Sequence, residues 1–109
     1  MLVKASRIPR LFGAQGLAVY PWVLIVPERL HDAALIAHEA VHCEEQKAGV
    51  IRWWLLYLMS RRFRMAAEVR AYRRQIELGG ITQLQAARCL CSMYMLGISE
   101  AEAIEALRP

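Results

Sequence analysis

The chain has 109 residues, and this length predicts a single domain over residues 1–109 with no separate regulatory domain. Hydrophobic residues make up 57% and charged residues 22% of the sequence, which excludes the disordered, collagen-like and low-complexity classes. The net charge is +4, and much of the excess is arginine between Arg61 and Arg74. We interpret these arginines as the solvated face of a helix, so no nucleic-acid partner is expected.

The first quarter of the chain predicts a small strand element. Residues 1–16 carry little pattern, and we expect an irregular arm with turns at Gly13 and Gly16. Two short runs of β-branched and aromatic residues, 16–20 and 22–26, then lie on either side of Pro21. They predict one or two strands, the second ending at Pro27.

Five helices are predicted after the strand element. Asp32 is a candidate N-cap for the first, which we expect from Ala33 to Lys47 with Gly49 as its stop. Because this helix is apolar on nearly all sides, it is expected at the centre of the domain. The others are predicted over 50–59 and 62–78, from the cap Thr82 to Gly97, and from a capping box at Ser99 to Leu107. The sequence therefore predicts a mostly helical α+β fold.

Cysteine usage and hydropathy bear on the compartment. Cys89 and Cys91 are two residues apart on a predicted helix, where their side chains diverge, so no disulfide between them is expected. The longest apolar run in the second half, Trp53 to Met59, is about a third of the ~20 residues that a bilayer requires. Pro21 and Pro27 interrupt the only N-terminal apolar stretch, which disfavours a signal peptide. A cytoplasmic location is the resulting prediction.

The same apolar run permits two interpretations. Trp53 to Met59 is followed by Arg61, Arg62 and Arg64, a pattern typical of an interfacial membrane helix. A buried helix followed by a basic turn has the same pattern. We favour the buried helix, because a core of this size needs the apolar area. Peripheral membrane contact is the alternative.

The motif that carries chemistry is His38-Glu39-Ala40-Val41-His42, an H-E-x-x-H sequence in the predicted central helix. An α-helical turn is about 3.6 residues, so His38 and His42 project from one face and can hold one zinc ion. Glu39 lies at the edge of that face, where a general base could take a proton from a metal-bound water without ligating the ion. Without a metal, all three polar groups would be costly to bury, which favours a zinc site.

A catalytic zinc site needs a third protein ligand. His31 lies just before the helix, seven residues from His38. The longer metzincin motif is excluded, because Glu45 occupies the position of its glycine. Glu68 is the favoured ligand, since it lies at the edge of the apolar stripe of a later helix. His31 and Glu45 are the alternative ligands. A half-exposed Glu68 that contacts Arg64, four residues upstream, is the alternative without a metal.

His38-Glu39-x-x-His42, followed by Glu68 in the setting Ala-Glu-Val-Arg-Ala-Tyr, resembles the gluzincin type of zinc metallopeptidase. The resemblance is strongest to small single-domain metallopeptidase-like proteins of bacteria and phages, and it covers about residues 23–78.

This resemblance implies a zincin-like active-site helix buried at the centre of the fold. It also implies a Zn²⁺ ion held by His38, His42 and Glu68, with Glu39 as general base and proton shuttle. Tyr72 would be a phenol donor to the oxyanion, its alternative role being that of a core aromatic residue. The implied activity is zinc-dependent hydrolysis of peptide (amide) bonds.

The larger peptidases of this type carry a further domain that walls the substrate cleft. Its absence from this sequence favours short peptides, or a loop of a specific protein, as substrate. Two other functions remain open: a zinc-stabilised helical interaction module without turnover, and a membrane-peripheral helical protein that uses residues 53–64.

Overall fold

A computed structural model describes all 109 residues and begins with a three-stranded sheet. Its strands are β1 (Leu2–Ala5), β2 (Gly16–Val19) and β3 (Trp22–Ile25). β3 lies in the middle, parallel to β1 and antiparallel to β2. Side chains alternate across β3, so Val23 and Ile25 are buried while Trp22 is exposed. The predicted strands on either side of Pro21 are thus confirmed.

The expectation of an irregular arm over residues 1–16 is wrong. The segment contains β1 and a 3-10 helix, η1 (Ile8–Phe12). All four residues of β1 are exposed, so its sequence carries no alternation of buried and exposed positions. β1 is a strand because it pairs with β3, with Leu2 opposite Trp22, and this pairing is a tertiary contact.

Five α-helices follow the sheet, which confirms the predicted mostly helical α+β fold. They are α1 (Ala33–Glu45), α2 (Val50–Met59), α3 (Arg61–Glu77), α4 (Gln83–Met93) and α5 (Glu100–Ala106). Two 3-10 turns, η2 (Pro27–Arg29) and η3 (Gln46–Ala48), flank α1. Side-chain oxygens cap four of the helices at their N-termini, from Asp32, Ser60, Thr82 and Ser99.

α4 is shorter than predicted. It ends at Met93, whereas the sequence favoured an end at Gly97. Met95 and Gly97 both have positive φ angles, of 53° and 66°, which end the helical path. Between them, Leu96 is fully buried in the core that α4 and α5 share with α3, and this burial favours the break.

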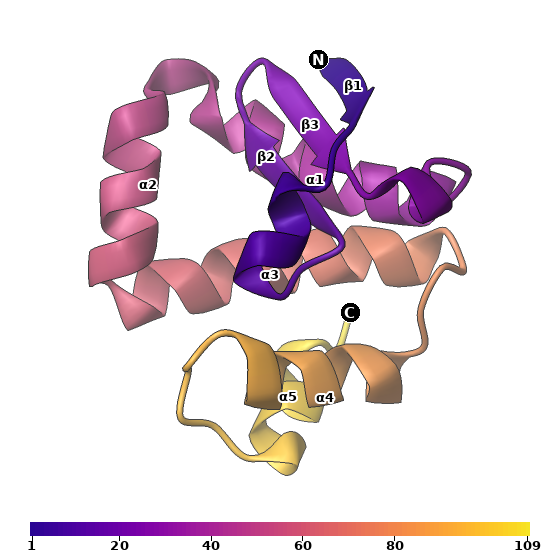
Figure 1. Cartoon of the computed structure of the whole chain (residues 1–109). Helices are drawn as coiled ribbons and strands as arrows, with labels where there is room; N and C mark the ends of the chain where they lie inside the picture. Colours follow the sequence, from indigo (N-terminus) through magenta and orange to yellow (C-terminus); the bar gives the residue numbers. More distant parts are fainter.

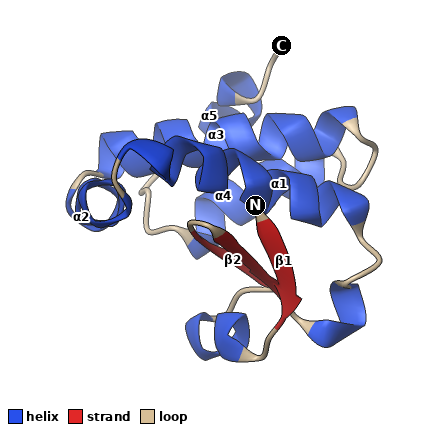
Figure 2. Cartoon of the chain, turned by 90° about the horizontal axis from the view of Figure 1, so that it is seen from above, coloured by secondary structure: helices blue, strands red, loops and turns tan.

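The elements stack in layers with α1 in the middle. α1 contacts β2 and β3 on one side and α3 on the other, which confirms its predicted central position. α4 and α5 pack together beyond α3, on the side away from the sheet (Figure 1). The view from above shows α1 and α3 lying alongside each other, with α2 at one edge of the molecule (Figure 2).

Two apolar clusters fill the space between these layers. One joins the sheet to α1 through Ala18, Val23, Ile25, Leu35 and Cys43, and the other joins α3 to α4 and α5. The long contact between α1 and α3 runs between the two clusters, so polar groups placed along it are shielded from water.

Two close contacts fix the ends of α1. At its C-terminal end, the buried Gln46 amide donates to the Ala18 carbonyl at 2.9 Å and accepts from the Tyr20 N–H at 2.8 Å. At its N-terminal end, Gly80 lies against Ala34, and a Cβ on Gly80 would be only 2.1 Å from that of Ala34. A residue with a side chain at position 80 would therefore push α1 and the end of α3 apart.

α2 is buried on one face only. Trp53 is buried, but several large apolar side chains of the same helix are exposed, so the favoured expectation of a buried second helix holds for only one side. No helix has the length and apolar character needed to cross a bilayer. Cys43, Cys89 and Cys91 are all free thiols.

Candidate metal centre

Three side chains from two helices converge at the contact between α1 and α3. Nε2 of His38 and Nε2 of His42 each lie 3.2 Å from the same oxygen, Oε1 of Glu68. The three potential ligand atoms all lie within 4.8 Å of one another. Two imidazoles and one carboxylate are a ligand set that zinc prefers, and catalytic sites use three such ligands.

Small residues on α3 explain how Glu68 reaches α1. Ala67 and Ala71 are fully buried, and with no side chain beyond Cβ they allow the two helices to approach closely. As a result His38, His42 and Glu68 expose only 5%, 4% and 3% of their surfaces. Buried groups of this kind need partners, because desolvation of an unpaired imidazole or carboxylate is costly.

Each histidine is held by a second hydrogen bond on its far nitrogen. Nδ1 of His38 donates to Oε1 of Gln75 at 2.9 Å, and Nδ1 of His42 lies 3.4 Å from Oε1 of Glu45. Glu45 is held in turn by Arg70, whose Nε donates to its other oxygen at 2.5 Å. These contacts fix the ring orientations and direct both Nε2 atoms toward Glu68.

The arrangement requires a positive charge at its centre. Each imidazole faces an oxygen acceptor at both nitrogens, and a neutral ring has only one N–H to donate. For His42 a second proton on the ring resolves this conflict, and a metal ion held by the three side chains would resolve it for both rings. The donor set is therefore complete for a cation, and it fits zinc in type, number and convergence.

The pKa shifts in the metal-free chain express the same requirement. Burial by itself would lower the pKa of His42, but the Glu68 carboxylate and the hydrogen bonds to Glu45 and Glu68 outweigh it and raise that pKa to about 10. Burial would raise the pKa of Glu68, but the charge of His42 and its hydrogen bonds with both histidines hold it well below the usual range. The protonated His42 ring and the Glu68 carboxylate thus stabilise each other.

Glu39 lies beside the three converging groups without joining them. Only 6% of its surface is exposed, and burial raises the pKa of its carboxyl group despite the nearby charges of His38 and His42. Gly16, at the start of β2, packs directly against its side chain: a Cβ on Gly16 would lie 2.8 Å from Cγ of Glu39. A raised pKa suits a group that has to accept and return a proton.

Two tyrosines border the centre, Tyr72 and Tyr57, and only Tyr72 was predicted from the sequence. The ring of Tyr72 packs edge-on against His38 with centroids 4.5 Å apart, while its hydroxyl pairs with that of Tyr94 at 2.6 Å. Tyr57 of α2 was missed. Its hydroxyl donates to Oε2 of Glu68 at 2.5 Å, a contact between helices that no spacing in the sequence predicts.

The alternatives considered for Glu68 occupy other places. His31 is exposed in the turn before α1 and lies outside the converging group, and Glu45 contacts the far nitrogen of His42. The expectation of a half-exposed Glu68 that contacts Arg64 is wrong. Glu68 is buried, and Arg64 donates to the backbone carbonyls of Tyr57 and Tyr94.

No protein-family model, curated protein or solved structure matches this chain. Functional inference therefore depends on the geometry of the centre and on the chemistry of its residues.

Proposed function

We propose that this chain is a zinc-dependent metallopeptidase of the gluzincin type, which hydrolyses amide bonds in peptide or protein substrates. The observation that carries the proposal is the position of Oε1 of Glu68, 3.2 Å from Nε2 of both His38 and His42. Glu39, the second residue of the motif, is buried beside these three residues but is not one of the converging ligand groups.

In this proposal His38, His42 and Glu68 hold the zinc ion. When bound, zinc would acidify water and polarise the carbonyl oxygen of a substrate. Gln75 and Glu45 keep the two imidazoles oriented by accepting from their Nδ1 atoms. Tyr57 holds the other oxygen of Glu68, which leaves Oε1 directed at the histidines.

Glu39 supplies the proton transfers. Its carboxylate would take a proton from the attacking water and pass it to the nitrogen of the leaving amine. Because burial raises the pKa of Glu39, the protonated form is more accessible than for an exposed glutamate. Gly16 leaves room for this side chain, since any Cβ at that position would contact it.

Metal content and turnover test the proposal separately. The purified full chain should contain one zinc per molecule by elemental analysis, and His38→Ala or Glu68→Ala should lose it, whereas the exposed His31→Ala should keep it. Glu39→Gln should retain zinc and lose hydrolysis of a quenched fluorogenic peptide library by roughly 10²–10⁴-fold. A chain that neither contains nor takes up stoichiometric zinc would overturn the proposal.

A second function is supported by the deep burial of the centre. None of the four groups exposes more than 6% of its surface, as a zinc site that stabilises a helical interaction module would require. Removing zinc from such a module would unfold the chain. The zinc-loaded chain would have no hydrolytic activity for a variant to change. Zinc-loaded chain that is inactive on the peptide library, and that unfolds with chelator, would favour this function over the peptidase.

A further inference from the structure

An apolar stripe covers the outer face of α2. It consists of Ile51, Leu55, Leu58 and Met59, whose spacing of four, three and one residues places them on one side of a helix. Their exposed fractions are 78%, 57%, 67% and 84%. No other element covers this face, and α2 lies at the edge of the molecule (Figure 1).

The opposite face of α2 is occupied by the protein. Trp53 stacks on Tyr57 with ring centroids 4.9 Å apart, and Tyr57 reaches Glu68. The helix is therefore apolar on both sides, but only one side is buried. Exposure of the other apolar side to water is unfavourable. At 1.5 Å per residue, ten residues span about 15 Å, half the hydrocarbon thickness of a bilayer, so α2 can lie in a membrane surface but cannot cross it.

The segment of sequence that carries the stripe has only positive charges. Between Gln46 and Ala67 the sequence has no aspartate or glutamate, and Arg52, Arg61 and Arg62 are exposed. These three arginines form no ion pair. Elsewhere arginines do pair with carboxylates, namely Arg10, Arg29, Arg70, Arg74, Arg88 and Arg108. The segment that carries the exposed apolar face thus has exposed, unpaired arginines and no acidic residue of its own to neutralise them.

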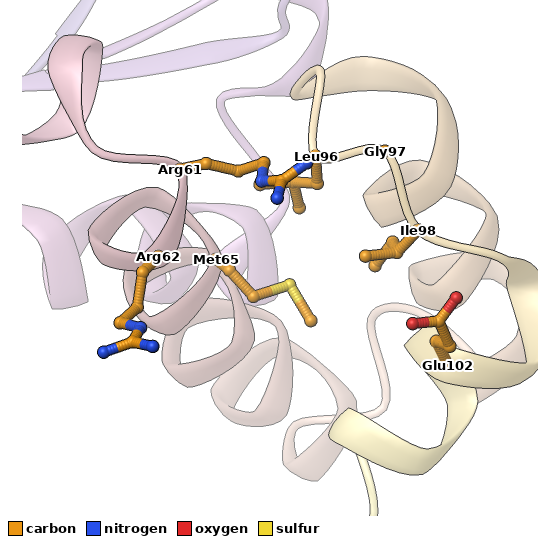
Figure 3. Close-up of a pocket in the computed structure, with 7 residues that line it drawn as sticks. All are labelled: Arg61, Arg62, Met65, Leu96, Gly97, Ile98 and Glu102. Carbon is orange, nitrogen blue, oxygen red and sulfur yellow. The ribbon is translucent and has the colours of Figure 1, made fainter.

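Two of these arginines, Arg61 and Arg62, lie at the start of α3 and point in different directions. A hollow of about 260 Å³ separates the start of α3 from the segment between α4 and α5. Arg61 extends along this hollow toward Leu96 and Gly97, whereas Arg62 points away from it into solvent (Figure 3). Glu102 lies on the far wall of the hollow, outside ion-pair distance of both arginines.

We propose that the outer face of α2 docks on an anionic phospholipid membrane. The stripe Ile51, Leu55, Leu58 and Met59 would enter the boundary between headgroups and acyl chains, and Arg52 and Arg62 would contact lipid phosphates. A second copy of the chain fits this surface less well. A two-fold contact through α2 would bring the same arginines together, with no acidic residue in the segment to neutralise them.

Docking would place the candidate metal centre close to the membrane. α2 has its outer face on the lipid and its inner face, through Tyr57, on Glu68. If the proposed peptidase function is correct, its substrates would be peptide segments presented at a membrane surface. The docking itself does not depend on that function, because it uses no residue that would bind zinc.

Vesicle flotation with the full chain tests the docking. The chain should float with vesicles of phosphatidylglycerol mixed with phosphatidylcholine, and binding should weaken with added salt and with pure phosphatidylcholine. Arg52→Gln combined with Arg62→Gln should weaken binding about 30-fold, from about fivefold for each arginine. Leu55→Ser combined with Leu58→Ser should weaken vesicle binding by roughly tenfold or more, because the stripe loses apolar area that the membrane would bury.

Exposed apolar residues elsewhere provide the matched control. Leu11 and Phe12 of η1 are as exposed as the stripe, so Leu11→Ser combined with Phe12→Ser should leave vesicle binding unchanged. All variants change exposed side chains, and circular dichroism would verify that each keeps the native helix content.

Three outcomes would overturn the proposal. The first is a failure of the full chain to bind phosphatidylglycerol vesicles. The second is a dimer by light scattering that the Leu55→Ser and Leu58→Ser variant dissociates, without vesicle binding, which would identify a second copy as the partner. The third is salt-sensitive binding to duplex DNA in place of vesicles, which would make the arginines a nucleic-acid contact.

Discussion

The Tyr57 hydroxyl donates to Oε2 of Glu68 at 2.5 Å, and this bond joins α2 to the carboxylate shared by both histidines. It occupies one oxygen of Glu68 and leaves the other, Oε1, to face the imidazoles. Burial raises the pKa of the Tyr57 hydroxyl, and the adjacent Glu68 charge raises it further, so Tyr57 stays protonated and always donates.

Tyr57→Phe should weaken zinc binding by about 10–100-fold, because it removes the group that orients the third ligand. Titration against a chromophoric chelator would measure this change. Tyr94→Phe is the matched control, since it removes a half-buried tyrosine hydroxyl that pairs with Tyr72 and makes no hydrogen bond to Glu68. Equal zinc affinity for the wild type and Tyr57→Phe would show that the hydroxyl has no orienting role.

Gln75→Leu should also weaken zinc binding by about 10–100-fold, because Nδ1 of His38 would lose its acceptor and the ring its fixed orientation. Gln75→Glu keeps an oxygen at that position and should bind zinc much more tightly than Gln75→Leu. The same chelator titration compares the two variants. If both bound zinc equally well, the acceptor on Nδ1 would be irrelevant to the centre.

Gly16→Ala should lower turnover on the fluorogenic peptides while the zinc content stays at the wild-type value. The new Cβ would lie 2.8 Å from Cγ and 3.1 Å from Oε2 of Glu39, so the base has to move. Gly49→Ala is the control, because its Cβ would meet only Cβ of Arg52, at an ordinary 3.7 Å. Unchanged turnover in Gly16→Ala would contradict the placement of Glu39 as the base.

Gly80→Ala should destabilise the chain by about 1–3 kcal/mol or more, because a methyl group there overlaps Ala34 at the contact between α1 and the end of α3. Urea unfolding followed by circular dichroism would give the change in the free energy of unfolding. Gly49→Ala again serves as the reference. A Gly80→Ala protein as stable as the reference would mean that the two helices separate at no cost.

The metal-free chain should lose stability as pH rises from about 6.5 toward 10. The pKa of His42 is raised from 6.5 to about 10 in the folded chain, so the folded state binds more protons than the unfolded state across this range. Bound zinc would replace that proton, so zinc affinity should increase with pH over the same range. Thermal unfolding of chelator-treated chain, at a series of pH values, tests the first expectation.

His31→Ala is the control for this pH dependence, because His31 is exposed and lies outside the centre. It should show the same loss of stability at high pH as the wild type. His42→Ala should remove the loss, since the group whose pKa is raised is then absent. A wild-type chain whose stability rises over this range would contradict the pairing of His42 with Glu68.

Local sequence signals determined most of the helical framework. Asp32, Thr82 and Ser99 marked helix starts because a capping bond links residues three apart, and four-residue spacing placed His38 and His42 on one face. These relationships lie within one or two helical turns, so they can be read without knowing the fold. The same holds for the short strands on either side of Pro21, although their antiparallel pairing was not predicted.

Tertiary structure alone decided which groups meet at the centre. Tyr57, Gln75 and Gly16 come from α2, α3 and β2, and each contacts a motif residue or Glu68 across a gap in the sequence. β1 likewise exists only through its pairing with β3. Such contacts depend on how helices and strands pack, and no periodicity within one element encodes them. Glu68 could be selected from its position on an apolar stripe, but its burial against both histidines followed only from the close approach of α1 and α3.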